Sequence, residues 1–312
     1  MQYVLLKTVY HKDRAKYQAL YEKRFQGEET VHLPITIGKS PAFYCITGEL
    51  LDIVYDIAML NTCIFQIDAE LSPIARDQFI SSCLINEVAM TNRIEGIHSS
   101  RKEIGELLEG IRGTKNEDTL LGLIRIALFH YLFGYIHPFY NGNGRVNRFI
   151  SSAQLAQELT PYICFQLSQT IKNNTKKYYD SFQFCNHPLN KGDLTPFLIM
   201  FLKLVKGAAM EIKESLEQKY GDLKHYSLVL QELPLGKQEA VFLSVVIQAT
   251  LFSPDGKGIT NKELTEHLSI SRTTISHRVE RIRSLGEYIL TDYFGKVKYY
   301  KVNLEFLDQA LS

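Results

Sequence analysis

The sequence predicts a mainly helical protein with a small α+β domain at its C-terminal end. Apolar residues recur at helical spacing through most of residues 50 to 235. A turn signal, Ser253 to Gly256, follows, and two short β-rich segments flank Gly295. Because 312 residues exceed the size of one typical domain, we expect more than one unit.

The breakers Pro34, Gly38 and Pro41 predict that the N-terminal part is an irregular arm or a short accessory element. A helical domain, a helical linker and the mixed domain should follow it. These four parts are placed at residues 1–48, 49–210, 211–250 and 251–312.

Local signals support the individual helices of the helical domain. Ser72-Pro73 can open a helix, with proline in the first turn, and Asp118 can cap another. Pro138 stops a helix at Ile136. The first expected helix begins near Leu50. The others run over residues 73–94, 103–110, 120–136, 145–159, 195–205 and 208–219.

The overall composition gives no electrostatic case for nucleic acid or membrane binding, because the net charge is +1. The five cysteines are spread singly, which argues against a zinc site or a disulfide framework and favours reduced thiols. The N-terminus lacks a signal-peptide pattern, and no uncharged apolar run reaches the ~20 residues that span a bilayer. We therefore expect a cytoplasmic protein without a membrane segment.

The segment from His137 to Arg148, HPFYNGNGRVNR, has the properties of an anion-binding loop. Gly142 and Gly144 allow a close approach of the backbone to a ligand. The loop leads directly into a helix N-terminus, where free N–H groups and the helix dipole attract anions. Arg145 lies three residues before Arg148, so both can clamp phosphate oxygens from one side.

Two further side chains of this loop suggest group-transfer chemistry. Asn143 can donate a hydrogen bond to another oxygen, and His137 can act as a general base towards a hydroxyl. Taken singly, a histidine before proline or a Gly-Asn-Gly tripeptide is usually structural. The fixed spacing of the whole set instead predicts a nucleotide-handling active site.

This segment resembles the motif of the Fic family, HPFx[D/E]GNGRxxR, at every specified position but one. The preceding helix is similar to the family's lead-in at Ala127, His130, Phe133 and Ile136. Two downstream segments, Tyr178-Tyr179 and Gly192 to Pro196, resemble its later signature. The resemblance covers roughly residues 50 to 210. It implies an all-α core and transfer of AMP from ATP to Tyr, Ser or Thr hydroxyls of a target protein.

The resemblance also implies a role for each matching residue. His137 would be the general base, and Phe139 would anchor the loop in the core. Gly142, Asn143 and Gly144 would form the anion hole for the α- and β-phosphates. Attack would be in line at the α-phosphorus, with pyrophosphate leaving.

Arg145 would support the β-phosphate and the loop, and Arg148 would reach the γ-phosphate. The one departure from the motif is Asn141, where the family usually has an Asp or Glu that ligates Mg²⁺. One neutral amide oxygen is a poor ligand for Mg²⁺ or Mn²⁺. We therefore expect ATP to bind, with weakened metal use and an activity that Asn141 puts in question.

Residues 91–96 have the form [S/T]xxxE[G/N], which resembles the family's inhibitory helix. Thr91 and Glu95 are four residues apart and share a helix face before Gly96. Glu95 would pair with Arg148 and thereby occupy the guanidinium that should hold the γ-phosphate. The alternative is a surface glutamate at a helix end. The following segment, residues 97–102, would be the flap that holds the target segment, with Ile97 and His98 as contacts.

The C-terminal domain resembles a winged helix-turn-helix. Thr260 can cap a helix over residues 261–268, a second helix should cover 272–285, and strands should cover 288–292 and 296–302. Between Asp255 and Leu304, nine Lys or Arg against six Asp or Glu give a charge of +3.

In a winged helix-turn-helix the second helix enters the major groove of DNA, and the wing contacts phosphates. The residues expected to face DNA are Arg272, Thr273, Thr274, Ser276, His277, Arg278, Lys296 and Lys298. Such a domain can instead serve contact with another protein or with a second copy in a homodimer. The charge is modest for a strong DNA binder.

Two functions from different classes stay open. One is a self-restrained nucleotidyltransferase whose winged helix selects a location or partner. The other is a DNA-binding regulator whose weakened catalytic domain senses nucleotide. His137 favours the first, because a sensor has no need of a base, and Asn141 favours the second. A third option is another phosphate-linked transfer, of UMP or phosphocholine.

Overall fold

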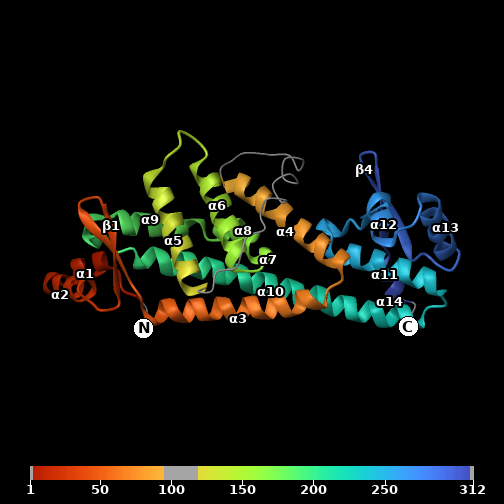
Figure 1. Ribbon diagram of the computed structural model, residues 1–312, viewed down its shortest axis with the longest axis horizontal. Coiled ribbons are helices and arrows are strands. Elements are labelled where there is room, and N and C mark those ends of the chain that lie inside the picture. The colour runs from red at the N-terminus through yellow and green to blue at the C-terminus, as the bar shows by residue number, and fades with distance from the viewer. Residues whose placement is uncertain (1–2, 95–118, 310–312) are drawn as a thin grey trace. The chain divides into compact units, whose positions relative to one another are not determined.

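The computed structural model describes residues 3–94 and 119–309, and the chain is mainly helical (Figure 1). The chain divides into two compact units. The first contains residues 1–63 and 86–212, and the second contains residues 64–85 and 213–312. Three long helices, α3 (Gly48–Glu70), α4 (Pro73–Ile94) and α10 (Thr195–Glu232), contribute residues to both units.

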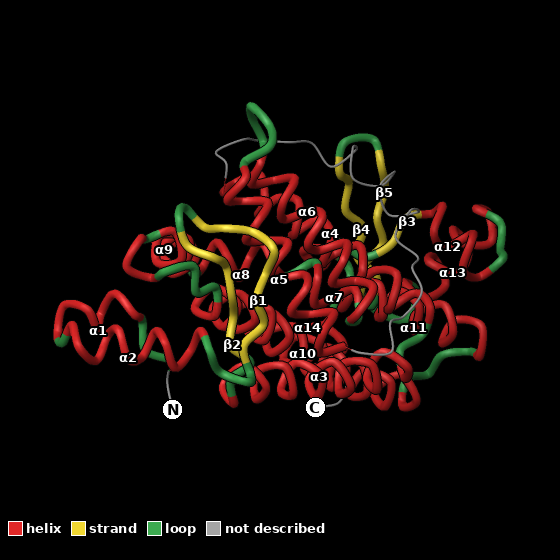
Figure 2. Tube along the Cα trace, turned by 60° about the vertical axis from the view of Figure 1, so that its left-hand side comes forward, coloured by secondary structure: helices red, strands yellow, loops and turns green. Residues whose placement is uncertain are grey.

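The first unit begins with two helices, α1 (Leu6–Lys12) and α2 (Arg14–Phe25), and a hairpin of β1 (Thr30–Ile37) and β2 (Ser40–Cys45) (Figure 2). This part is therefore regular rather than an irregular arm. Pro34 lies where the pairing register of β1 with β2 shifts, between His32 and Thr36. A proline fits a strand at such an irregularity because it has no N–H to donate.

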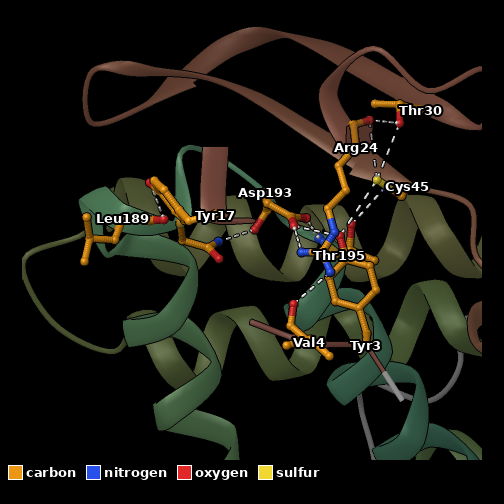
Figure 3. A network of polar contacts seen from close by, with 10 residues as sticks. Tyr3, Val4, Tyr17, Arg24, Thr30, Cys45, Leu189, Asp193 and Thr195 are labelled. Atoms are coloured by element: carbon orange, nitrogen blue, oxygen red, sulfur yellow. Dashed lines mark hydrogen bonds and ion pairs between the residues drawn. The ribbon is translucent and has the colours of Figure 1, made fainter. Parts of the chain in front are cut away.

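The buried carboxyl group of Asp193, in the turn before α10, binds residues of this N-terminal part (Figure 3). Asp193 is fully buried and accepts hydrogen bonds from the Tyr3 hydroxyl at 2.7 Å and the Thr195 N–H at 3.0 Å. The Arg24 guanidinium lies 3.3 Å from its carboxylate. Burial raises the pKa of Asp193, while Thr195, Tyr3 and Arg24 lower it. Gly192 beside it has a φ of +78°, and its carbonyl accepts a hydrogen bond from the Phe43 N–H at 3.0 Å.

The predicted helices over residues 50–94 and 120–136 are present as α3, α4 and α5 (Thr119–Ile136). The next helix, α6 (Asn143–Glu158), begins two residues earlier than expected. The unit is completed by short helices that pack around α5 and α6. They are α7 (Pro161–Cys164), α8 (Leu167–Asn173), α9 (Thr175–Asn186) and a 3₁₀ turn, η3 (Pro188–Asn190).

The two helices expected over residues 195–205 and 208–219 are wrong as separate elements, because α10 runs unbroken from Thr195 to Glu232. Gly207 lies inside it, and a Cβ at that position would make ordinary contact with Thr170. One glycine costs a helix about 1 kcal/mol, which the buried apolar face of α10 outweighs.

The second unit contains α11 (Lys237–Phe252), a 3₁₀ turn η4 (Pro254–Gly256), β3 (Ile259–Thr260), α12 (Asn261–Leu268) and α13 (Arg272–Arg283). The hairpin β4 (Ile289–Phe294) and β5 (Val297–Val302) and then α14 (Leu304–Gln309) follow. The strands form an antiparallel sheet in the order β3-β5-β4. Thr260 caps α12 as expected and forms a capping box with Glu263.

Among the described residues, one helix, α3, is long and apolar enough to cross a membrane by length and composition. Only 28% of its apolar window is buried. The core helix of a protein without a membrane segment passes the same test, so this finding is weak evidence for a span.

Candidate active site

His137 ends helix α5 in a strained backbone conformation. Its N–H donates to the Phe133 carbonyl at 3.0 Å, which is the last helical hydrogen bond, and its φ is 54°. Glycine usually occupies such a left-handed position, because a Cβ there costs of order 1 kcal/mol or more. The His137 side chain is exposed, with Nδ1 3.4 Å from the Gly134 carbonyl. The loop therefore presents a histidine where the backbone favours glycine.

The loop enters α6 through Gly142, whose φ is 81° and whose N-cap position carries no side-chain hydrogen bond. The first N–H groups of a helix lack intrahelical partners, so this end attracts an anion. A Cβ on Gly142 would lie 3.3 Å from Nη2 of Arg145, so the guanidinium lies close over the glycine. The N-terminus of α6 and the Arg145 charge thus converge at one place.

The Asn143 side chain holds the loop together instead of pointing towards a ligand. The Phe139 N–H donates to its Oδ1 at 2.9 Å, and its Nδ2 donates to the Phe139 carbonyl at 2.5 Å. Oδ1 and one N–H of Nδ2 are used within the loop, so a phosphate oxygen would have to accept from the second N–H of Nδ2. The backbone N–H of Asn143, at the start of α6, can also face an anion.

Arg145 carries a polar atom that suits a bound anion. Its Nε is buried and has no hydrogen-bond partner in the part of the chain that the structure describes. An orphaned buried donor costs about 1–3 kcal/mol, and a phosphate oxygen would satisfy it. An oxygen of a bound anion would therefore fit beside Arg145 at this helix end.

Arg148, one turn further along α6, is almost fully buried, with 1% of its surface exposed. Its Nε donates to Oγ1 of Thr91 at 2.8 Å, and its Nη2 donates to the Thr91 carbonyl at 3.0 Å. The two predicted site residues Thr91 and Arg148 are therefore in direct contact. Glu95, Gly96 and the expected flap at 97–102 lie outside the described residues.

Close to Arg148 lies a buried glutamate, Glu87, that is not predicted from the sequence. Glu87, on α4, accepts hydrogen bonds from the Ser168 N–H at 2.8 Å, the Ser168 hydroxyl at 2.6 Å and the Ser152 hydroxyl at 3.2 Å. Burial raises the pKa of Glu87 to about 7, while the Ser168 and Ser152 hydrogen bonds and the Arg148 charge lower it. A signal was available, since Glu87 follows Cys83 by four residues on an apolar helix face.

A second buried group is His130, for which the sequence predicts only a place in the helix before the loop. It is fully buried in α5, with Nδ1 2.8 Å from the Ser151 hydroxyl and Nε2 2.8 Å from the Tyr178 hydroxyl. Burial lowers the pKa of His130 to about 3, and the Arg148 charge adds to this effect. His130 is therefore neutral, and its contact with Ser151 joins α5 to α6.

Phe139 does not anchor the loop in the core, because 51% of its surface is exposed and its ring packs beside Phe133. That expectation is wrong.

Asn141 is exposed and offers one neutral oxygen. Among residues 3–94 and 119–309, no cluster of three His, Cys, Asp or Glu could hold a metal ion. At Asn141 itself, one neutral amide oxygen is a poorer ligand for Mg²⁺ or Mn²⁺ than a carboxylate.

The second predicted surface lies on α13 and the β4–β5 hairpin. Arg272, Thr273, Ser276, His277 and Lys296 are exposed there. The other three residues expected to face DNA are partly buried and engaged. Arg278 donates to Gln238 at 3.3 Å, the Thr274 hydroxyl lies 2.9 Å from Ser271, and Lys298 lies over the Tyr300 ring.

The first unit is thus mainly helical, with the uncapped N-terminus of α6 at the end of a loop that begins at an exposed histidine. Residues 76–155 match the model of the Fic/DOC family, so the chain contains a Fic/DOC family domain. Over 72 residues it is 36% identical to a protein named "Protein adenylyltransferase Fic" from Aedes aegypti, and equally to its namesake from Culex quinquefasciatus. These matches cover 23% of this chain and 13% of each mosquito protein.

Among solved structures, a Fic family protein from Desulfovibrio desulfuricans G20 is similar to this chain. Its TM-score is 0.42 and its sequence identity is 17%, over 83% of this chain and 97% of that one.

Proposed function

We propose that this protein is an auto-inhibited nucleotidyltransferase that moves AMP from ATP to a Tyr, Ser or Thr hydroxyl of a target protein. The observation that carries the proposal is the orphaned Nε of Arg145 beside the uncapped N-terminus of α6, next to the strained His137. The name of the mosquito relatives supports AMP as the transferred group.

The proposed reaction needs one base and a set of anion ligands. His137 takes the proton of the acceptor hydroxyl, and that oxygen attacks the α-phosphorus in line. The bond from the α-phosphorus to the bridging oxygen breaks, and pyrophosphate leaves with the electron pair. The N–H groups at the start of α6 and the Arg145 guanidinium stabilise the charge on the phosphates. No step here depends on a metal ligand from the protein.

Auto-inhibition is proposed because Arg148 is already occupied. Thr91 binds its Nε and Nη2, so the guanidinium is directed at α4 rather than towards a γ-phosphate. Glu95, one turn beyond Thr91, would add an opposite charge to the same contact. Releasing this part of α4 would free Arg148 for ATP.

The test is incubation of wild type, Glu95→Gly and Glu95→Gly/His137→Ala with ATP labelled on its α-phosphate, with Mg²⁺ or Mn²⁺. We expect stronger self-labelling of Glu95→Gly than of wild type, and none of the double variant. Labelling with a UMP or phosphocholine donor instead would keep the transferase and change its substrate. Absence of labelling of Glu95→Gly with every donor would contradict the transferase.

A second candidate is a DNA-binding regulator with a nucleotide-sensing domain. The order α11, β3, α12, α13 and the β4–β5 hairpin, with sheet order β3-β5-β4, is typical of a winged helix. The exposed Arg272 and His277 on α13 suit contact with phosphates. The exposed neutral Asn141 also favours this candidate over a fast enzyme. The same surface can serve contact with a protein partner or a second copy.

Fluorescence anisotropy with randomised duplex DNA tests this candidate. We expect Arg272→Ala to weaken binding and to reduce its salt dependence. Arg125→Ala, which removes an exposed charge from α5, is the matched control and should have no effect. Equal binding by wild type and Arg272→Ala would argue against DNA contact through α13.

We propose a cytoplasmic location on chemical grounds. All five cysteines are free thiols, and four of them are buried, which suits a reducing compartment. Fractionation of cells into soluble and membrane fractions tests the location, and recovery in the membrane fraction would contradict it.

A further inference from the structure

Two side-chain contacts join α4 to α6, one helical turn apart. Thr91 binds Arg148, and one turn away Glu87 binds Ser152. Residues four apart lie on one helix face. Glu87 and Thr91 therefore face α6 together, just as Arg148 and Ser152 face α4. Because both contacts involve the same two helices, the Glu87–Ser152 contact helps to set the position of the Thr91–Arg148 contact.

Of the two α4 residues, Glu87 makes the larger number of hydrogen bonds. Its carboxyl group accepts three hydrogen bonds, two of them from the backbone and hydroxyl of Ser168 in the first turn of α8. Glu87 is 7% exposed, and Ser168 is fully buried. The Glu87–Ser168 contact joins α4 to α8 as well as α6. It therefore restrains both the position of α4 along its axis and its rotation about that axis. A side chain that leaves such donors unpaired would be costly.

We propose that Glu87 is a positioning residue of the inhibitory device, which fixes α4 in the register that places Thr91 on Arg148. This inference rests on the proposed function, because it concerns restraint of that transferase. Glu87 would act through α4 and would touch neither the nucleotide nor the target. Loss of its three hydrogen bonds would let α4 shift, and Arg148 would then become available to ATP.

The near-neutral character of this carboxyl group agrees with the proposal. The charged groups facing Glu87 include Arg148 on α6, which lowers the pKa of Glu87, while Cys164 on α7 has a raised pKa and stays neutral. The restraint therefore depends on the three hydrogen bonds of Glu87 and not on its charge. A glutamine can accept from the Ser168 N–H and donate to the hydroxyl oxygens, so it preserves the packing without the charge.

The experiment measures self-labelling from ATP for wild type, Glu87→Ala, Glu87→Gln and Ser168→Ala, with Glu95→Gly as the released reference. We expect Glu87→Ala to raise labelling about tenfold, which corresponds to about 1.4 kcal/mol in the equilibrium between the held and released states. Ser168→Ala should raise it less, and Glu87→Gln should stay close to wild type. Thermal unfolding of each variant checks that the fold persists.

Two comparisons separate positioning from general destabilisation. In the Glu95→Gly background, Glu87→Ala should leave labelling unchanged, because the restraint is already gone. A lower signal there would show a merely structural role. Glu239→Ala removes a buried glutamate of the second unit that is paired with Arg281. An equal rise for Glu239→Ala would overturn the proposal.

The outcomes also separate this inference from the proposed function. If Glu95→Gly is not labelled by any donor, the transferase fails and Glu87 has nothing to restrain. If Glu95→Gly is labelled while Glu87→Ala remains at the wild-type level, the transferase stands and the positioning role of Glu87 is wrong.

Discussion

Thr91 accepts two hydrogen bonds from Arg148, one at its hydroxyl oxygen and one at its backbone carbonyl. The guanidinium is therefore held by both the side chain and the main chain of one residue. A substitution at Thr91 can remove the first contact but leaves the second in place.

Thr91→Val removes the hydroxyl acceptor while keeping the shape of the side chain. A hydrogen bond to a charged group is worth about 1.5–3 kcal/mol, so we expect more self-labelling than wild type and less than Glu95→Gly. Thr91→Ser keeps the hydroxyl and is the control. Wild-type labelling by Thr91→Val would show that the hydroxyl takes no part in the restraint.

His137→Gly should stabilise the protein while it abolishes transfer. Glycine adopts the φ of 54° without the strain that histidine bears there, so we expect a gain of roughly 1 kcal/mol. Urea unfolding measures this gain. His137→Ala keeps a Cβ and therefore the strain, and should bring no such gain. Lower stability of His137→Gly than of His137→Ala would contradict the argument.

Arg145→Lys should weaken ATP binding, because lysine has no counterpart to the orphaned Nε. We expect an increase in Kd of about tenfold, or about 1.4 kcal/mol, measured by titration calorimetry. The matched control is Arg125→Lys, an exposed position on α5. An unchanged Kd for Arg145→Lys would mean that Nε does not contact the phosphates.

Gly192→Ala should lower the free energy of unfolding by about 3 kcal/mol. The φ at Gly192 is +78°, and a Cβ there would lie 2.3 Å from the Pro41 carbonyl oxygen. In contrast, Gly207→Ala lies within α10 and should stabilise by ~0.5–1 kcal/mol. Thermal unfolding compares the two. A harmless Gly192→Ala would show that the hairpin and the turn before α10 can separate freely.

Glu87 and His130 should give opposite pH dependences of stability. The pKa of Glu87 is raised from 4.5 to about 7, so its stabilising contribution is present below 4.5 and is lost as the pH rises through 7. The pKa of His130 is lowered from 6.5 to about 3, so its contribution is present above 6.5 and is lost as the pH falls towards 3. Each titrating proton contributes up to about 1.4 kcal/mol per pH unit.

Urea unfolding between about pH 5 and about pH 7 checks these signs. Relative to wild type, Glu87→Gln should gain stability as the pH rises, and His130→Gln should lose it. If both differences are independent of pH, the two groups do not titrate differently in the folded and unfolded states.

Local signals in the sequence predicted many element boundaries correctly. Ser72-Pro73 does precede α4, and Thr260 caps α12, because caps and prolines act through the backbone of their own helix. The sequence does not reveal the hairpin β1–β2, because Pro34 resembles a breaker although proline is compatible with a bulged edge strand. It predicts two helices in place of α10, because the residues change from apolar to polar near Gly207.

The candidate site was predicted to a different extent. The loop residues can be proposed from the sequence because their spacing is local. Glu87 and Ser168 are 81 residues apart, and only the fold brings them together. The use of Asn143 within its own loop also escaped prediction, since an amide can face either a ligand or a backbone group. Sequence alone does not decide between these two orientations.

The backbone strain at His137 places stability and activity in opposition at a single residue. A change to glycine would relieve the strain and remove the imidazole together. Strained backbone conformations cluster at active sites, where stability is often lower than it could be. The strain at His137 therefore favours working chemistry at this loop over a role as a passive nucleotide sensor.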